Sequence, residues 1–340
     1  MKEEKIKIAL DCMGGDNAPK IVIEGAEIVA SSKKDVHFLF YGDSSKINPL
    51  IKNYPKLKNR YTIIHTDQEI SSDEKPSIAL RRGTQSSMRL AINAVKEGEA
   101  DVAVSAGNTG ALMAIAKIVL RPLPSIERPA IVTSIPNQKN SGTVLLDMGA
   151  NVECDSDVLF QFAVMGHAFA KIALKIKDPK IGILNIGSED LKGNDAVRSA
   201  ALLIKESDLK DNFYGYVEGN DITKGTVDVV VTDGFTGNIS LKVIEGTAKM
   251  VTELLREAFS RSFISKIGYL LAKTAIKKST QKMDPRLHNG AMLIGLNGVV
   301  VKSHGGTDSL GFSNAISVAI SLVKDKINEQ ISNELKGSES

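Results

Sequence analysis

The chain has 340 residues, of which 42% are apolar, 24% charged and only 5% aromatic. These proportions are typical of a globular protein, whereas a net charge of +3 with few aromatic side chains argues against a nucleic-acid-binding surface. Two cysteines without a Cys-x-x-Cys pair indicate neither a disulfide framework nor a zinc site, so we expect no metal and no cofactor. The charged start and the lack of a long apolar run predict a cytoplasmic chain with no signal peptide and no membrane-spanning helix.

Apolar, β-branched runs alternate with helical patterns along almost the whole chain. Strands are expected at residues 6–10, 36–41, 61–64, 101–105, 129–134, 143–147, 181–185, 213–217, 228–232, 292–296 and 299–303. Helices are expected at residues 19–32, 84–97, 109–120, 155–175, 193–206, 238–258 and 308–332. This alternation predicts a three-layer αβα fold, in which a mostly parallel, doubly wound sheet carries helices on both faces.

The last two expected strands depart from the parallel pattern. Asn297-Gly298 lies between them, which predicts one antiparallel hairpin joined to an otherwise parallel sheet. No repeat or low-complexity linker divides the sequence, so residues 1–335 are expected to form a single domain. The polar residues 336–340 are expected to form a disordered tail.

The loop after the first expected strand suits a small anion. Residues 6–10 lead into Asp11, and Gly14 and Gly15 follow before a helix that opens near residue 19. Glycines let the backbone approach a ligand closely, and a helix start offers unpaired N–H groups that attract phosphate. One such turn alone is more often a tight connection with no ligand.

Polar, glycine-containing loops also follow five later strands. They contain Ser105-Ala106-Gly107-Asn108-Thr109-Gly110, Asp147-Met148-Gly149-Ala150-Asn151, Asn185-Ile186-Gly187-Ser188-Glu189, Thr232-Asp233-Gly234-Phe235-Thr236-Gly237-Asn238 and Lys302-Ser303-His304-Gly305. Loops at the carboxyl ends of parallel strands lie along one edge of the sheet, where ligands bind. The sequence therefore predicts an enzyme with one polar, phosphate-binding cleft at that edge.

These blocks, taken in order, resemble the signature sequences of the PlsX family, the bacterial phosphate acyltransferases of phospholipid synthesis. The set begins with Asp11-Cys12-Met13-Gly14-Gly15-Asp16-Asn17-Ala18-Pro19 and also includes Lys192-Gly193-Asn194. The resemblance covers almost the whole chain, and it implies an isocitrate/isopropylmalate dehydrogenase-like fold and a homodimer. Two positions depart from the family pattern, because Cys12 stands where alanine is usual and Gly306 where serine is common.

The resemblance also implies an activity. Members of the family transfer a long-chain fatty acyl group reversibly from acyl carrier protein to inorganic phosphate, which gives acyl phosphate for phospholipid synthesis. Phosphate is already an anionic nucleophile near neutral pH. The enzyme is therefore expected to position phosphate beside the thioester and to stabilise the oxyanion during direct attack, with no covalent intermediate.

The resemblance marks Lys192 and Asn238 as the catalytic residues. The Lys192 ammonium can pair with phosphate or with the oxyanion, although a loop lysine is more commonly solvated. The Asn238 amide can donate to the oxyanion, or it can cap the helix that is expected to start there. Asn108 and Thr109 can bind phosphate, cap a helix, or do both.

Two further residues in the loops have side chains that could react. His304, which precedes Gly305, can contact phosphate or protonate the leaving thiolate. Cys12 lies in the first loop and suggests an acyl-cysteine intermediate, but no histidine or aspartate partner is evident. We therefore expect Cys12 to take no part in the reaction.

The segment 258–283 differs from the rest of the chain. It has no acidic residue, and its positive charges are Arg261, Lys266, Lys273, Lys277, Lys278 and Lys282. Apolar side chains, including Phe263, Ile267 and Leu271, follow helical spacing. The pattern fits either a packing helix or a basic amphipathic helix at a membrane interface. The family resemblance favours peripheral attachment to the anionic inner face of the cell membrane, near an acyltransferase that consumes acyl phosphate.

Two other functions explain parts of the pattern. A nucleotide-dependent dehydrogenase would account for the first turn, but Gly-x-Gly-x-x-Gly and an acidic residue for the ribose are missing there. A membrane-associated scaffold that holds a phosphorylated ligand would account for the basic segment, but not for so many polar loops. Phosphate-dependent loss of a thioester would exclude both alternatives.

Overall fold

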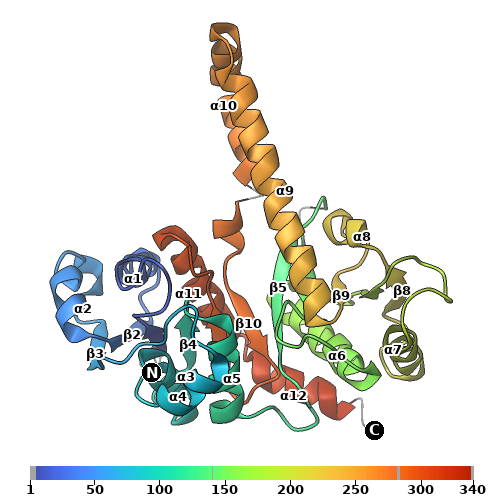
Figure 1. Ribbon diagram of the computed structural model, residues 1–340, viewed down its shortest axis with the longest axis horizontal. Helices are drawn as coiled ribbons and strands as arrows, with labels where there is room; N and C mark the ends of the chain where they lie inside the picture. Colours follow the sequence, from blue (N-terminus) through green and yellow to red (C-terminus); the bar gives the residue numbers. More distant parts are fainter. Residues whose placement is uncertain (1–4, 140, 282–283, 338–340) are drawn as a thin grey trace.

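The computed structural model describes residues 5–139, 141–281 and 284–337, and its centre is one sheet of eleven strands (Figure 1). The strands are β1 (Ile6–Asp11), β2 (Val36–Gly42), β3 (Tyr61–His65), β4 (Val102–Ser105), β5 (Ala130–Pro136), β6 (Gly142–Leu146), β7 (Ile181–Leu184), β8 (Phe213–Val217), β9 (Val229–Val231), β10 (Ala291–Ile294) and β11 (Val299–Lys302). Their order across the sheet is β3-β2-β1-β4-β11-β10-β5-β6-β9-β7-β8. Each strand coincides with an expected one, to within two residues at either end.

The sheet consists of two parallel blocks that run in opposite directions. β3, β2, β1, β4 and β11 form one block, and β6, β9, β7 and β8 form the other. β10 and β5 lie between the blocks, and each is antiparallel to both of its neighbours. The expected hairpin is confirmed as β10–β11, but the rest of the sheet is not uniformly parallel. The connection from Pro136 to Gly142 is too short for a crossover helix, so β5 and β6 pair as a second hairpin.

Helices cover both faces of the sheet, which confirms the three-layer αβα fold (Figure 1). One face carries α1 (Lys20–Ser32), α2 (Ser44–Ile51), α6 (Ser156–Ala173), α7 (Asp195–Glu206), α11 (Ser309–Lys324) and α12 (Ile327–Gly337). The other face carries α3 (Pro76–Arg82), α4 (Ser87–Lys96), α5 (Thr109–Leu120), α8 (Gly219–Lys224) and the base of α9 (Gly234–Ser260). Short 3₁₀ helices span Pro55–Leu57 and Pro285–His288. Alternate residues of the inner strands enter the two apolar cores, as in β11, where Val300 faces α5 and Val301 faces α11.

The C-terminal helix differs from the expected one. The predicted helix 308–332 is interrupted at Lys326, whose φ of +51° turns the chain between α11 and α12. Ile327 and Ile331 of α12 are then fully buried in the core that α6 shares. Such burial contributes roughly 1.5–3 kcal/mol per side chain. Of the tail predicted at 336–340, α12 includes the first two residues and the last three lie outside the described residues.

The helices α9 and α10 (Phe263–Gln281) form a long arm that projects from the body (Figure 1). Asp233 caps α9 by accepting a hydrogen bond from the Thr236 N–H at 2.8 Å. The helix therefore begins at Gly234, before the expected start at residue 238.

The basic amphipathic segment predicted at 258–283 is not one continuous helix. The chain turns between Ser260, where α9 ends, and Phe263, where α10 begins. Phe259 therefore belongs to α9, and its ring packs against Tyr269 of α10 with 5.4 Å between the ring centroids. Residues 282–283 of the segment lie outside the described residues.

Candidate active site

The buried carboxylate of Asp11 ties three segments together at the end of β1. Its Oδ1 accepts a hydrogen bond from Ser87 Oγ at 2.6 Å, and its Oδ2 accepts one from Ser105 Oγ at 2.6 Å. Burial raises the pKa of Asp11, and the hydrogen bonds from the two serines act against that rise. Because both oxygens accept hydrogen bonds from neighbouring segments, Asp11 organises the surrounding loops.

The loops after β1, β4 and β11 meet at their glycines. A Cβ atom at Gly14 would lie 2.7 Å from the backbone nitrogen of Gly107, so no side chain fits between these two loops. The Asp16 N–H donates to the Gly305 carbonyl at 3.0 Å, which joins the first loop to the last. Gly15 has a φ of +102°, which favours glycine. The structure thus brings Asp11, Gly14, Gly15 and Gly305 together.

Two backbone donors in this cluster have no internal partner. In the described part of the chain, neither the Gly15 N–H nor the Gly305 N–H donates a hydrogen bond. Both glycines lie beside the Ala106 carbonyl, since a Cβ atom on either would be 3.4 Å from that oxygen. Unpaired N–H groups in adjoining glycine loops are a suitable environment for an anion.

His304 lies on the surface at this cluster. Its N–H donates to Asn289 Oδ1 at 3.0 Å, and its Nδ1 accepts from the Gly306 N–H at 3.2 Å. A neutral imidazole that accepts at Nδ1 carries its proton at Nε2. In this form His304 can donate a hydrogen bond from Nε2, whereas transfer of a proton requires the imidazolium form.

Asn108 and Thr109 follow the same cluster at the start of α5. Asn108 caps the helix by accepting from the Ala111 N–H at 2.9 Å, as one of its two expected roles requires. Its amide nitrogen also donates to the Ser72 and Glu74 carbonyls at 2.8 and 3.0 Å. The Asn108 side chain is thereby occupied, whereas Thr109 is exposed at the first helical position.

A second buried carboxylate, Asp147, organises the other half of the molecule at the end of β6. Its Oδ1 accepts from the Ile131 N–H at 2.9 Å, and its Oδ2 accepts from the Asn151 N–H at 2.7 Å. The Asn151 carbonyl in turn accepts from the Gly234 N–H at 2.7 Å, which fastens this loop to the start of α9. The loop was predicted from the sequence, but this role of Asp147 was not.

Asn238 borders the Asp147 loop from the second turn of α9. A Cβ atom at Gly149 would lie 3.5 Å from the Asn238 Cβ. The alternative role of Asn238 as helix cap is wrong, because Asp233 caps α9. The Asn238 side chain is exposed and makes no hydrogen bond within the described ranges, so its amide is available to a ligand.

Lys192 lies in the loop between β7 and α7. Asn185 Nδ2 donates to the Lys192 carbonyl at 3.2 Å, while the Lys192 side chain is exposed and has no ion-pair partner among the described residues. β6 and β7 both pair with β9 in parallel. The loops that carry Asp147, Lys192 and Asn238 therefore leave the sheet at the same edge.

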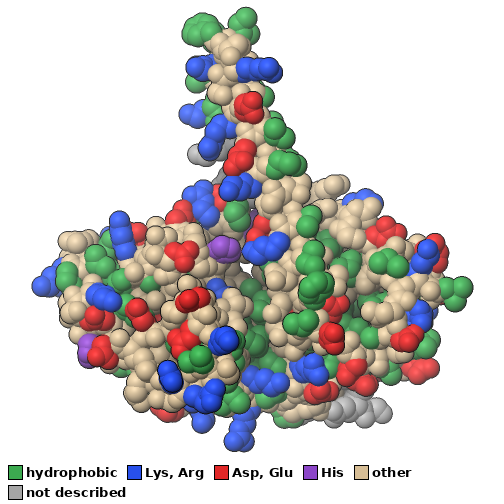
Figure 2. Space-filling view, in the orientation of Figure 1, with side chains coloured by type: hydrophobic (Ala, Val, Ile, Leu, Met, Phe, Trp, Pro, Cys, Tyr) green, Lys and Arg blue, Asp and Glu red, His purple; other side chains and the backbone are tan. Residues whose placement is uncertain are grey.

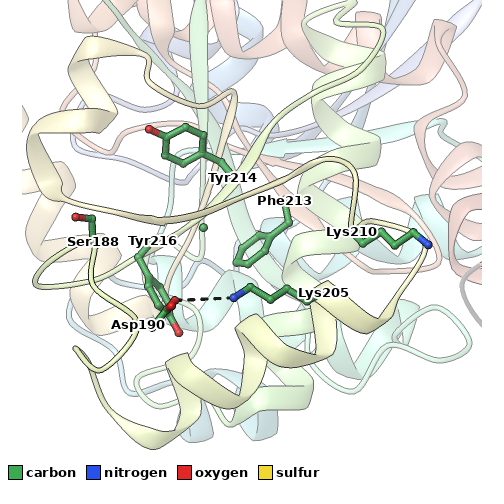
Figure 3. Close-up of a pocket in the computed structure, with 8 residues that line it drawn as sticks. Ser188, Asp190, Lys205, Lys210, Phe213, Tyr214 and Tyr216 are labelled. Atoms are coloured by element: carbon green, nitrogen blue, oxygen red, sulfur yellow. Dashed lines mark ion pairs between the residues drawn. The ribbon is translucent and has the colours of Figure 1, made fainter.

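The Lys192 loop also lines a hollow of about 500 Å³ at the outer edge of the sheet (Figure 3). Figure 3 shows Phe213 and Tyr216 of β8 on the side of Lys205, whose Nζ lies 3.9 Å from Asp190 Oδ1. The residues that line the hollow include neither Lys192 nor any residue of the glycine cluster.

The expectation of a single edge for all the loops is wrong, because the two parallel blocks run in opposite directions. The helix α9 reconnects the two groups. Asn238 and Lys242 lie one turn apart on one face of α9. Burial is the main cause that lowers the pKa of Lys302 at the end of β11, and the nearby Lys242 acts in the same direction. Lys242 therefore lies near the end of β11, and Figure 2 shows a hollow between the two halves beneath the arm.

Lys302 is a residue of this region that the sequence analysis quoted within a motif but gave no role. Its Nζ donates to the Ser303 carbonyl and lies 3.5 Å from the Ala106 carbonyl. Burial lowers the pKa of Lys302 to about 8. The burial of the Lys302 side chain was not predicted, because lysines are usually exposed.

The thiol of Cys12 faces away from these loops. It is fully buried among the apolar side chains that pack on α1 and α11. Burial raises the pKa of Cys12 well above its ordinary value, so the thiol stays protonated. This environment supports the expectation that Cys12 is not a nucleophile. In the ranges that the structure describes, no cluster of His, Cys, Asp and Glu side chains could hold a metal ion.

The predicted membrane residues all lie on α10. Phe263, Ile267 and Leu271 are four residues apart, so they share one helix face, and their exposed fractions are 77%, 45% and 84%. Figure 2 shows green apolar side chains at the far end of the arm. Among the described residues, no helix is long and apolar enough to cross a membrane.

Solved structures share this fold. A phosphotransacetylase from Streptococcus pyogenes has 18% identity and a TM-score of 0.63, with 94% of each chain covered. A branched-chain phosphotransacylase from Enterococcus faecalis V583 has 12% identity and a TM-score of 0.57, with 94% of this chain and 99% of that chain covered. At these identities the likeness shows the fold alone.

Sequence relatives show the family. A family model described as "Fatty acid synthesis protein" matches residues 6–330. A phosphate acyltransferase from Paramagnetospirillum magneticum is 53% identical over 329 residues, which cover 97% of this chain and 93% of the relative. A phosphate acyltransferase from Rhodospirillum centenum is 54% identical over 332 residues, covering 98% and 93%. The chain is therefore an enzyme of the acyltransferase class. It belongs to the PlsX family of phosphate acyltransferases.

Proposed function

We propose that this enzyme transfers a long-chain fatty acyl group from the thioester of acyl carrier protein to inorganic phosphate, which gives acyl phosphate for bacterial phospholipid synthesis. The observation that carries the proposal is the cluster of glycine loops whose Gly15 and Gly305 N–H groups lack an internal acceptor in the described chain. Lys242, one turn beyond Asn238 on α9, lies near Lys302 beside this cluster. An anion held at the glycines would therefore lie near an amide donor that belongs to the other half of the molecule.

The reaction needs positioning more than activation. A phosphate oxygen attacks the thioester carbonyl carbon, and the carbonyl oxygen becomes an oxyanion that Asn238 and Lys192 stabilise. The intermediate collapses as the carbon–sulfur bond breaks, and the thiolate takes a proton from water or from the imidazolium form of His304, which becomes neutral imidazole. The products are acyl phosphate and free acyl carrier protein, and the same steps run in reverse. Removing one oxyanion donor typically costs about 10²–10³ in rate.

The central test uses the purified enzyme, acyl carrier protein thioester and inorganic phosphate. Hydroxylamine traps acyl phosphate as a hydroxamate, which we expect to form only when phosphate, thioester and enzyme are all present. Sulfate in place of phosphate is the matched control, since it has similar shape but gives no stable product. Loss of thioester without phosphate would indicate a hydrolase and would contradict the proposal. A parallel reaction with a coenzyme A thioester reports which donor the enzyme prefers.

We also propose that the enzyme attaches peripherally to the inner face of the cell membrane through the arm. The support is the exposed face of Phe263, Ile267 and Leu271 on a helix that also carries Lys266 and Lys273. Attachment would place the enzyme near a membrane acyltransferase that uses acyl phosphate. The exposed apolar side chains of α9, Val243, Met250 and Leu254, favour a homodimer in which a second copy covers them. Sedimentation velocity tests the dimer.

A further inference from the structure

Lys302 holds its ammonium at the point where the glycine loops meet. It is the last residue of β11, and its side chain extends on the side of the sheet that faces α9. Its Nζ lies 3.5 Å from the Ala106 carbonyl, the same oxygen that Gly15 and Gly305 approach. The ammonium and the two glycines thus lie around the same carbonyl oxygen.

The ammonium of Lys302 makes no direct ion pair with another described residue. In the described part of the chain, no carboxylate lies within 4.0 Å of its Nζ, whose hydrogen-bond acceptors are backbone carbonyls. Asp11 and Asp16 are near enough to raise the pKa of Lys302, but neither carboxylate lies within 4.0 Å of its Nζ. Lys242 of α9 is near enough to lower the pKa of Lys302, while its own Nζ pairs with Glu245 Oε2 at 2.7 Å. A half-buried ammonium that has no direct carboxylate partner is a suitable ligand for an anion.

We propose that Lys302 is the principal cationic ligand of inorganic phosphate in this enzyme, with Lys242 of α9 as a second and weaker contact. Phosphate is the small anion of the proposed reaction, and it can accept from both ammonium groups and from the Gly15 and Gly305 N–H groups at once. The inference rests on the proposed function for the identity of the anion. It adds that residues of both halves hold one phosphate.

The test separates phosphate binding from catalysis. Lys302→Met keeps the length of the side chain and removes its charge. We expect the KM for phosphate to rise about tenfold or more, the usual effect of losing a charge-assisted hydrogen bond, while the KM for the acyl donor stays within about twofold. Lys302→Arg should restore part of the phosphate affinity. Equal rises in both KM values, or no rise for phosphate, would overturn the proposal.

A second measurement does not depend on turnover. Inorganic phosphate should raise the melting temperature of the wild-type enzyme, and that shift should be lost in Lys302→Met. Lys242→Met alters an exposed residue of α9, so the variant should fold normally. We expect its KM for phosphate to rise less than that of Lys302→Met.

Lys20→Met is the matched control, because Lys20 is an exposed lysine at the start of α1, close in sequence to the first glycine loop. An equal loss of phosphate affinity in Lys20→Met would mean a general effect of net charge and would refute a direct contact. If the wild type binds phosphate through Lys302 but forms no acyl phosphate, the proposed function fails and this inference stands. If acyl phosphate forms while Lys302→Met keeps its phosphate affinity, only this inference fails.

Discussion

A Cβ atom at Gly237 would lie 1.9 Å from the carbonyl oxygen of Asp147. This contact is how α9 enters the molecule, since the helix start is pressed against the backbone of the loop after β6. Gly237 precedes Asn238 directly. The position of the proposed oxyanion donor therefore depends on a residue that has no side chain.

Gly237→Ala should push the start of α9 away from Asp147 and displace Asn238. Overpacking of this kind costs about 1–3 kcal/mol, so the melting temperature should fall together with the rate. Gly246→Ala on the same helix is the control, because a Cβ atom there meets nothing within 4 Å. That variant should be as stable as the wild type or slightly more so, since alanine favours a helix interior. Similar losses in both variants would show that the contact with Asp147 is unimportant.

Lys192→Ala and Asn238→Ala should each lower kcat by at least about a hundredfold, as expected for loss of an oxyanion donor. Both side chains are exposed, so the melting temperature should stay near the wild-type value. Lys205→Ala is a control on the neighbouring helix α7, where the lysine pairs only with Asp190 at 3.9 Å. Near-wild-type rates for the first two variants in a hydroxamate assay would disprove the assignment.

Cys12→Ala should retain activity close to that of the wild type, because the nucleophile is phosphate and the thiol is buried and protonated. A modest loss of stability is expected from the smaller side chain. Mass spectrometry of the enzyme during turnover should find no acyl group on Cys12. An acylated Cys12 peptide would replace direct attack with a two-step mechanism.

Leu271→Glu should release the enzyme from anionic vesicles while activity in solution survives. Burying the apolar face of α10 contributes roughly 1.5–3 kcal/mol per side chain, and each nearby lysine adds about 1 kcal/mol. The attachment should therefore be reversible and weaken with salt. Ile118→Glu on α5 is the control, since Ile118 is 60% exposed but lies outside the arm. Co-sedimentation that is unchanged in Leu271→Glu, or insensitive to lipid charge, would identify α10 as a packing helix.

Glu334 should make the C-terminal helix sensitive to acid. The imidazole of His167 and the ammonium of Lys171, both on α6, lower the pKa of Glu334 to about 2. A carboxyl group whose pKa is lower in the folded state stabilises the fold above its unfolded value of 4.5, and that stability is lost as the pH falls toward 2. Glu334→Gln should therefore reduce the fall in melting temperature between pH 5 and pH 3, relative to the wild type. Identical pH profiles would mean that the contact is not formed in solution.

The strands could be predicted because their signal is local. Runs such as Val299–Lys302 are short, apolar and β-branched, and they end in polar loops. The direction of the strands could not be predicted in the same way, because β6 pairs with β9 and β4 with β11, which are remote in sequence. Only the short link between Pro136 and Gly142 carried a local sign of the reversal.

The candidate site was predictable in its parts but not in its assembly. The glycine loops could be recognised because positive φ and close backbone approach restrict a position to glycine, as at Gly15. Lys302 was overlooked because burial of a lysine depends on what surrounds it and not on its neighbours in sequence. The prediction of one helical segment over 258–283 was wrong because a turn separates Phe259 from Phe263, although their spacing is helical.

The length of α9 sets the distance between the proposed oxyanion donor and the tip of the arm. Asn238 and Ser260 belong to α9 without interruption, so about 1.5 Å per residue separates them by roughly 33 Å. An enzyme that contacted a bilayer through this tip would hold its reaction centre well above the lipid headgroups. A folded carrier protein could then dock without touching the membrane. The acyl phosphate would leave into water and not into lipid, so a short transfer through the aqueous layer would precede its use.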